Sequence, residues 1–182
     1  MITMRSLITA VLAMTIAVGC TATLAASSAA RQTGSSYPSG GLGLSLDDFD
    51  ALYGPGEPGQ AYMQYPLQNG MYYVGATKSQ RAVSYIERSW NQGSGVSLDD
   101  AQAEAESLLP DDAKFIESYQ ANSARILYGT HVDRYQSRTI SQRLKDGQRR
   151  YGSNLVIIYH LIPASQAYDV VVDRFMIVPA ER

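Results

Sequence analysis

The chain carries the same helix-opening motif twice, and this repeat constrains its fold more than any other feature. Ser45-Leu46-Asp47-Asp48 returns 52 residues later as Ser97-Leu98-Asp99-Asp100. A serine at the start of a helix accepts a hydrogen bond from a first-turn N–H group, and nearby acids favour the positive end of the helix. Each motif therefore predicts the start of a short helix, and together they predict two related units.

The first unit, residues 44–90, is expected to place its helix before a meander of strands. Gly54-Pro55 should end this helix, because glycine favours a helix C-terminus and proline cannot continue a helix. Strands are expected at residues 61–65, 71–76 and 81–90. The first two flank Gln68-Asn69-Gly70, which is a hairpin turn signal.

The second unit, residues 96–178, begins with a helix expected at residues 98–109. Four strands should follow, at residues 114–120, 125–130, 154–162 and 167–178. A polar stretch of about 20 residues separates the second of these strands from the third, and it has room for a short helix with Ile140 and Leu144 on one side. The expected fold class is α+β: two related units, each a helix and an antiparallel meander, forming one domain.

The N-terminus has the pattern of a secretory signal. Arg5 is the single charge before an uncharged apolar run at residues 7–18. This run is too short to cross a bilayer as a helix, which takes about 20 apolar residues. We therefore expect residues 1–19 to be a signal peptide of an exported bacterial protein that has no membrane span.

The only cysteine of the chain is Cys20, at the end of this signal. The segment Ala17-Val18-Gly19-Cys20 resembles the lipobox of bacterial lipoproteins, in which Leu usually stands where Ala17 is. The resemblance implies that Cys20 is lipidated and anchors the protein to a membrane of the cell envelope. A lone thiol in an exported protein has no internal disulfide partner. The alternative is an ordinary signal cut after Ala25 or Ala26, which would give a secreted or periplasmic soluble protein.

Residues 20–43 are small and polar, and we expect them to be a flexible tether that carries the domain at residues 44–182. The charge of that domain is uneven. Residues 42–112 hold eleven acids and three bases, whereas residues 131–151 hold six bases and two acids. A basic stretch can meet anionic lipid or nucleic acid. We interpret this one as a solvated surface, and the export signal argues against a nucleic-acid partner.

The opening of the first unit resembles small α+β modules of bacterial envelope lipoproteins. The residues concerned are Gly43-Leu44-Ser45-Leu46-Asp47-Asp48-Phe49, Leu52-Tyr53-Gly54-Pro55 and Tyr72-Tyr73-Val74. The SmpA/BamE family of outer-membrane assembly lipoproteins has such modules, and so do the tandem-repeat β-lactamase inhibitor proteins. In both families the module binds another protein and catalyses nothing. The resemblance, over residues 42–90, therefore implies a protein-binding or scaffolding module with an unknown envelope partner.

Catalytic chemistry has few candidates in this sequence. His131 and Asp133 form an H-x-D pair, and His160 lies in an apolar strand. A metal site usually needs three or four ligands, so two histidines and scattered acids predict neither a metal nor another cofactor. We expect no catalytic residues and interpret His131 as a residue of a surface loop. The alternative function is a hydrolase that uses His131 and Asp133.

Tyrosine is the residue type that favours binding. The chain has 13 tyrosines, and their rings suit both half-buried sheet faces and interfaces. Tyr72, Tyr73 and Tyr85 are the candidate binding residues. Tyr72 and Tyr73 are neighbours on one strand and should point to opposite faces, one under a helix and one exposed. A tyrosine-lined sheet leaves a small-ligand-binding domain as a further alternative.

Overall fold

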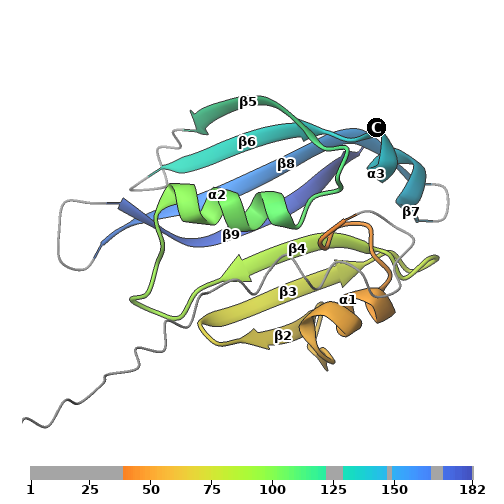
Figure 1. The fold of residues 1–182 in the computed structure, drawn as a ribbon, viewed down its shortest axis with the longest axis horizontal. Coiled ribbons are helices and arrows are strands. Elements are labelled where there is room, and N and C mark those ends of the chain that lie inside the picture. Colours follow the sequence, from red (N-terminus) through yellow and green to blue (C-terminus); the bar gives the residue numbers. More distant parts are fainter. Residues whose placement is uncertain (1–38, 122–128, 147–148, 165–169, 182) are drawn as a thin grey trace, which may run out of the picture.

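The computed structural model describes residues 39–121, 129–146, 149–164 and 170–181. In this part of the chain an antiparallel sheet packs against short helices, so the fold is α+β. Figure 1 shows α1 and α2 on the same face of the sheet. The elements are α1 (Leu46–Tyr53), β1 (Glu57–Pro58), β2 (Met63–Leu67), β3 (Gly70–Ala76), β4 (Val83–Ser89), α2 (Leu98–Ser107), β5 (Lys114–Ala121), β6 (Thr130–Gln136), α3 (Arg138–Arg143), β7 (Lys145–Asp146), β8 (Arg149–Pro163) and β9 (Val170–Glu181).

The strand order across the sheet is β1-β2-β3-β4-β9-β8-β6-β5, and β7 pairs with β8 beside this path. Strands close in the sequence pair with one another on each side of the centre. The two sides meet where β4 pairs with β9, with Ile86 opposite Ile177 and Ser89 opposite Arg174. β9, the last of the described strands, therefore lies next to β4, the last strand of the first predicted unit.

Both predicted helix starts are confirmed. The Ser45 hydroxyl accepts a hydrogen bond from the Asp48 N–H at 3.1 Å and donates to the Asp48 carboxylate at 2.7 Å. Ser97 and Asp100 make the same two bonds at the same distances. Gly54 ends α1 with a φ of 85°, a conformation that glycine adopts without strain. The second helix ends at Ser107, two residues earlier than predicted.

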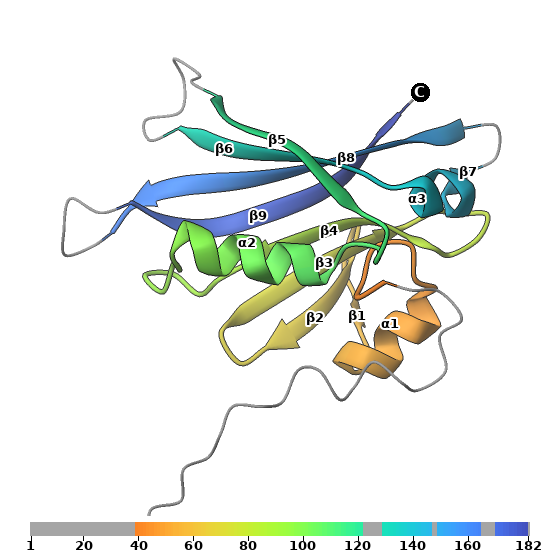
Figure 2. The same ribbon diagram turned by 45° about the horizontal axis from the view of Figure 1, so that its top comes forward.

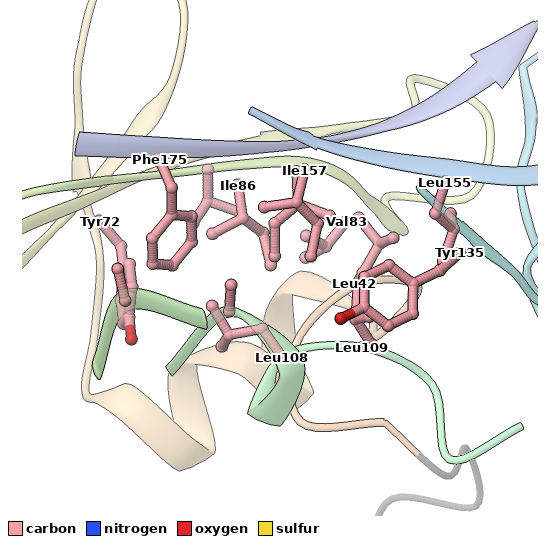
Figure 3. Packing of buried hydrophobic residues seen from close by; sticks show 14 of the residues in the cluster. Leu42, Tyr72, Val83, Ile86, Leu108, Leu109, Tyr135, Leu155, Ile157 and Phe175 are labelled. Carbon is pink, nitrogen blue, oxygen red and sulfur yellow. The ribbon is translucent and has the colours of Figure 1, made fainter. Parts of the chain in front are cut away.

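The hydrophobic core lies between the helices and the sheet (Figure 3). Leu42, Leu108, Ile86 and Ile157 are completely buried there. The Leu42 N–H donates to the Leu108 carbonyl at 2.8 Å, and Ser39 pairs with Pro110. Residues 39–43, which the sequence assigned to the tether, are therefore part of the packed domain.

The main difference from the sequence-based expectation is β6. Residues 131–136 were expected to begin a polar stretch outside the sheet, but together with Thr130 they form a strand between β8 and β5. His131 therefore lies in a strand rather than in a surface loop. The short helix expected after it is confirmed as α3, in which Ile140 is completely buried. Most of the strand expected at 125–130, the signal at 1–19 and Cys20 lie outside the described residues.

Candidate functional site

The two neighbouring tyrosines of β3 point to opposite faces of the sheet, as predicted. Tyr72 faces the helices and is 5% exposed, and its hydroxyl donates to Glu104 of α2 at 2.6 Å. Burial raises the pKa of Tyr72, and the charge of Glu104 adds to this rise. Tyr73 is half-buried on the other face. Tyr72 is thus a core residue, and Tyr73 is the member of the pair that a partner can reach.

We call the face of the sheet that points away from α1 and α2 the open face. Side chains opposite one another in neighbouring strands share a face, so the strand register defines its residues. One row crosses seven strands in continuous register: Tyr119, Val132, Ile158, Met176, Glu87, Tyr73 and Gln64. Val132 is buried between its neighbours, Tyr119 is 47% exposed, and the other five are half-buried. The centre of the open face is therefore apolar.

Charged side chains lie beside this apolar centre. Arg134 pairs with Glu117 across β6 and β5, in a row that continues through Val156 and Val178. On the other side of the centre, His160 lies opposite Arg174. An apolar centre with charged and polar surroundings has the composition of a protein-binding surface.

A stacked aromatic pair lies at the β3–β4 end of the open face. The rings of Tyr62 and Tyr85 are 4.9 Å apart at an angle of 24°, and Tyr62 is 42% exposed. Gly75 leaves the space for this pair, because a Cβ atom there would lie 3.3 Å from the Tyr62 ring. The Tyr85 hydroxyl donates to Glu87 at 2.7 Å. Burial raises the pKa of Tyr85, and this hydrogen bond adds to the rise.

His131 and Asp133 lie on the opposite face, under α2. The Nε2 atom of His131 is 3.0 Å from Asp133 Oδ1 and 2.8 Å from the Ser118 hydroxyl. Asp133 is completely buried, and its other carboxylate oxygen accepts from Gln102 of α2 at 2.8 Å. The structure thus brings together the two residues that the sequence singled out, and adds Ser118 and Gln102 to them.

This cluster does not have the arrangement of a serine hydrolase. In such enzymes the acid holds one ring nitrogen of the histidine, and the serine donates to the other. Here Ser118 and Asp133 both approach the same nitrogen, Nε2 of His131. When Nε2 donates its hydrogen to Asp133, it has no lone pair left to accept a hydrogen bond from the Ser118 hydroxyl. The Gln102 side chain instead links α2 to β6 through its contacts with His131 and Asp133. Within the described ranges, no three His, Cys, Asp or Glu side chains are grouped as metal ligands.

The sequence identified only part of the open face. Tyr73 and Tyr85 were candidates, but Val132, Ile158 and Met176 were not. The first of these was missed because β6 was not recognised as a strand. Ile158 and Met176 lie in predicted strands. Those strands have apolar residues on both faces, and this pattern was the available signal that the second face is apolar too. Their position beside Tyr73 depends on the β4–β9 pairing, which local patterns do not specify.

No protein-family model, no curated protein and no solved structure matches the chain. In the described part of the chain, no helix has the length and hydropathy needed to cross a membrane.

Proposed function

We propose that this protein is a non-catalytic lipoprotein of the cell envelope, which binds another protein through the open face of its sheet. The observation that carries the proposal is the continuous row from Tyr119 to Tyr73, whose centre is Val132, Ile158 and Met176. No described helix or strand covers this row. Contiguous apolar surface of this kind marks interaction sites, and tyrosine and methionine are enriched in them.

We also propose that the domain consists of two related units. The first is α1 with β2, β3 and β4, and the second is α2 with β5, β6, β8 and β9. Support comes from the identical caps of the two helices. Strand order adds to it, because from the central β4–β9 pair each unit runs outward in reverse sequence order. An experimentally determined structure tests the idea, since the two helices and their meanders should superpose by one rotation.

Anchoring through Cys20 is the second part of the proposed function. The support is the Gly19-Cys20 pair directly after the apolar run. The chain enters the domain at Ser39, whose hydroxyl donates to the carbonyl of Leu42 and which pairs with Pro110 after α2. Ser39 therefore meets the domain beside the end of α2, on the side of the helices, where its hydroxyl also lies 3.4 Å from the Leu108 carbonyl.

Fatty-acid labelling tests the anchor directly. The wild-type chain should take up label and sediment with membranes, whereas Cys20→Ala should do neither, because stable anchoring of this chain depends on its acyl groups. A matched control is Ser27→Ala, which changes a residue of the proposed tether and should keep both properties. Wild-type protein that takes up no label would remove the lipoprotein part of the proposal and leave the binding part standing.

Site-specific photocrosslinking in intact cells tests the open face. A photoreactive amino acid at Tyr73 should capture one defined protein, whereas the same group at Asp111, exposed on the side of the helices, should not. Met176→Asp in the Tyr73 crosslinking variant should weaken capture, because it places a charge in the apolar centre. His131→Ala should leave capture unchanged. Equal capture from both positions, or loss of capture in a folded His131→Ala protein, would contradict the proposal.

A further inference from the structure

The two edges of the sheet differ in a way that the proposed function does not use. One edge is β1, which has only two residues, and one of them is Pro58. Short strands and prolines protect an edge, because they offer few free backbone groups to another strand. The other edge is β5, which has eight residues and no proline. Figure 2 shows β5 as the outermost strand of its side.

The side chains of β5 are unusually exposed and apolar for an edge strand. Phe115, Ile116 and Tyr119 are 55%, 52% and 47% exposed, and they are three of the five exposed large hydrophobic residues in the described chain. Charges often protect such edges. β5 has two charged residues: Lys114 stands at its first position, away from the middle of the strand, and Glu117 is paired with Arg134 of β6. Among the described strands, β5 pairs with β6 alone, which leaves one side open to pairing.

We propose that β5 pairs antiparallel with β5 of a second copy of this chain, which joins the two sheets across a twofold axis. The register of β5 with β6 shifts between Phe115 and Glu117, so regular pairing is expected for the residues from Glu117 onward. A twofold axis perpendicular to the sheet places one residue of this regular part opposite its own copy and sets paired residues on the same face. An axis at Ser118 sets Glu117 of each copy opposite Tyr119 of the other and brings no like charges together. An axis at Glu117 would oppose two carboxylates, which is unfavourable.

The size of this contact predicts a weak dimer. Pairing of one short strand with its copy buries on the order of 700 Å² in total, which is below the roughly 1,200 Å² of stable interfaces. Association should therefore be reversible and depend on concentration. Of the row on the open face, the contact involves only Tyr119, at its β5 end, and it leaves Val132, Ile158, Met176 and Tyr73 outside the dimer. The dimer can therefore be tested separately from the proposed binding function.

Sedimentation equilibrium of the full chain in density-matched detergent tests the dimer. The wild-type protein should pass from monomer to dimer across the micromolar range. Ile116→Lys combined with Tyr119→Lys places two charges on each edge and should weaken association by about tenfold or more, equivalent to about 1.4 kcal/mol. Tyr62→Lys changes an exposed tyrosine away from β5 and should leave the association constant unchanged. Circular dichroism of each variant confirms that it folds.

A cysteine pair tests the register. Ser118→Cys should form a disulfide-linked dimer under mild oxidation, because residues opposite one another in antiparallel strands lie within disulfide distance. Glu57→Cys, on the other edge strand, should give no more disulfide-linked dimer than the wild-type chain. A wild-type protein that stays monomeric throughout, or association lost in Tyr62→Lys but kept in the β5 variant, would overturn the proposal. So would crosslinking of Ser118→Cys to a different protein.

Discussion

Ser45 and Ser97 cap their helices with the same two hydrogen bonds, although 52 residues separate them in the chain. Their backbones are also alike, with φ and ψ of −67° and 156° at Ser45 and of −62° and 158° at Ser97. In both, the hydroxyl satisfies an N–H group of the first turn that has no partner within the helix. The two serines should therefore contribute similarly to stability.

Replacing either cap should destabilise the domain. Ser45→Ala and Ser97→Ala should each lower the free energy of unfolding by about 1 kcal/mol, since an N–H group of the helix loses its partner. Urea denaturation measures this change. Ser45→Asn and Ser97→Asn are the matched controls and should retain most of the stability, because asparagine caps helices about as well as serine. Alanine variants that unfold at the wild-type urea concentration would contradict the cap assignment.

Glu104 should be the most sensitive acid of α2. It accepts hydrogen bonds from Tyr72 at 2.6 Å and from the Arg88 guanidinium at 2.8 Å, and the Arg88 side chain is only 6% exposed. Glu104→Ala leaves a buried positive charge without its acid and should cost about 3 kcal/mol in unfolding free energy. Glu104→Gln should cost less, because it keeps an oxygen acceptor.

Chemical denaturation of these two variants gives the comparison. Asp111→Ala, at an exposed acid outside α2, is the control and should change stability by no more than about 0.5 kcal/mol. If Glu104→Ala costs no more than the control, Arg88 is held by other contacts. Those contacts would be the carbonyls of Ser89 and Asn69, which its guanidinium also reaches.

Asp112 should make the domain less stable in acid. Partial burial raises the pKa of this carboxyl, but hydrogen bonds from Ser137 and from the N–H groups of Thr139 and Arg138 outweigh burial and lower the pKa overall. A lowered pKa in the folded state stabilises the fold above the unfolded pKa of about 3.9, and this contribution is lost as the pH falls through the folded pKa.

The variant Asp112→Asn isolates that contribution. Wild-type protein should be more stable than Asp112→Asn at neutral pH, and the difference should shrink once the pH falls below about 4. Denaturation series at several pH values measure it. Asp111→Asn, at the exposed neighbouring acid, should show no such trend. A stability difference that stays constant down to strongly acidic pH would show that Asp112 acts through its shape rather than its charge.

Five tyrosines should resist ionisation in the folded protein. The pKa values of Tyr65, Tyr72, Tyr85, Tyr135 and Tyr159 are all raised, first by burial and then by neighbouring carboxylates. A raised pKa contributes stability that is fully present below the ordinary value of about 10 and is lost as the pH rises above it. Near-ultraviolet absorbance of tyrosinate should therefore lag behind that of the urea-unfolded chain. Superimposable titrations of the two states would contradict this expectation.

Local sequence signals were sufficient where the chemistry of an element is local. Ser45, Ser97 and Gly54 act on their own helices, and Asn69-Gly70 turns between strands that are adjacent in the chain. The positions of β2, β3 and β4 followed from these signals within a few residues.

Strand β6 was not predicted from the sequence because the side chains on its buried face are polar. His131, Asp133 and Tyr135 face α2, where Gln102 and Glu106 provide hydrogen-bond partners. Apolar alternation was therefore absent, and the buried position of Asp133 depends on a helix that lies about 30 residues away in the sequence. Ile158 and Met176 of the open face were missed for a related reason, since their place beside Tyr73 depends on the pairing of β4 with β9.

That central pairing has a consequence for how the chain folds. Ile86 and Ile177 are 91 residues apart in the sequence yet opposite each other in the sheet. Contacts of such long range form slowly, because a large loop must close before they stabilise anything. Within residues 44–90, β4 pairs with β3 on one side, but its other edge stays unpaired until β9, which is synthesised much later, arrives beside it. The sheet around β4 is therefore complete only after β9 has formed, and a chain cut short before β9 would expose β4 as an unpaired edge strand.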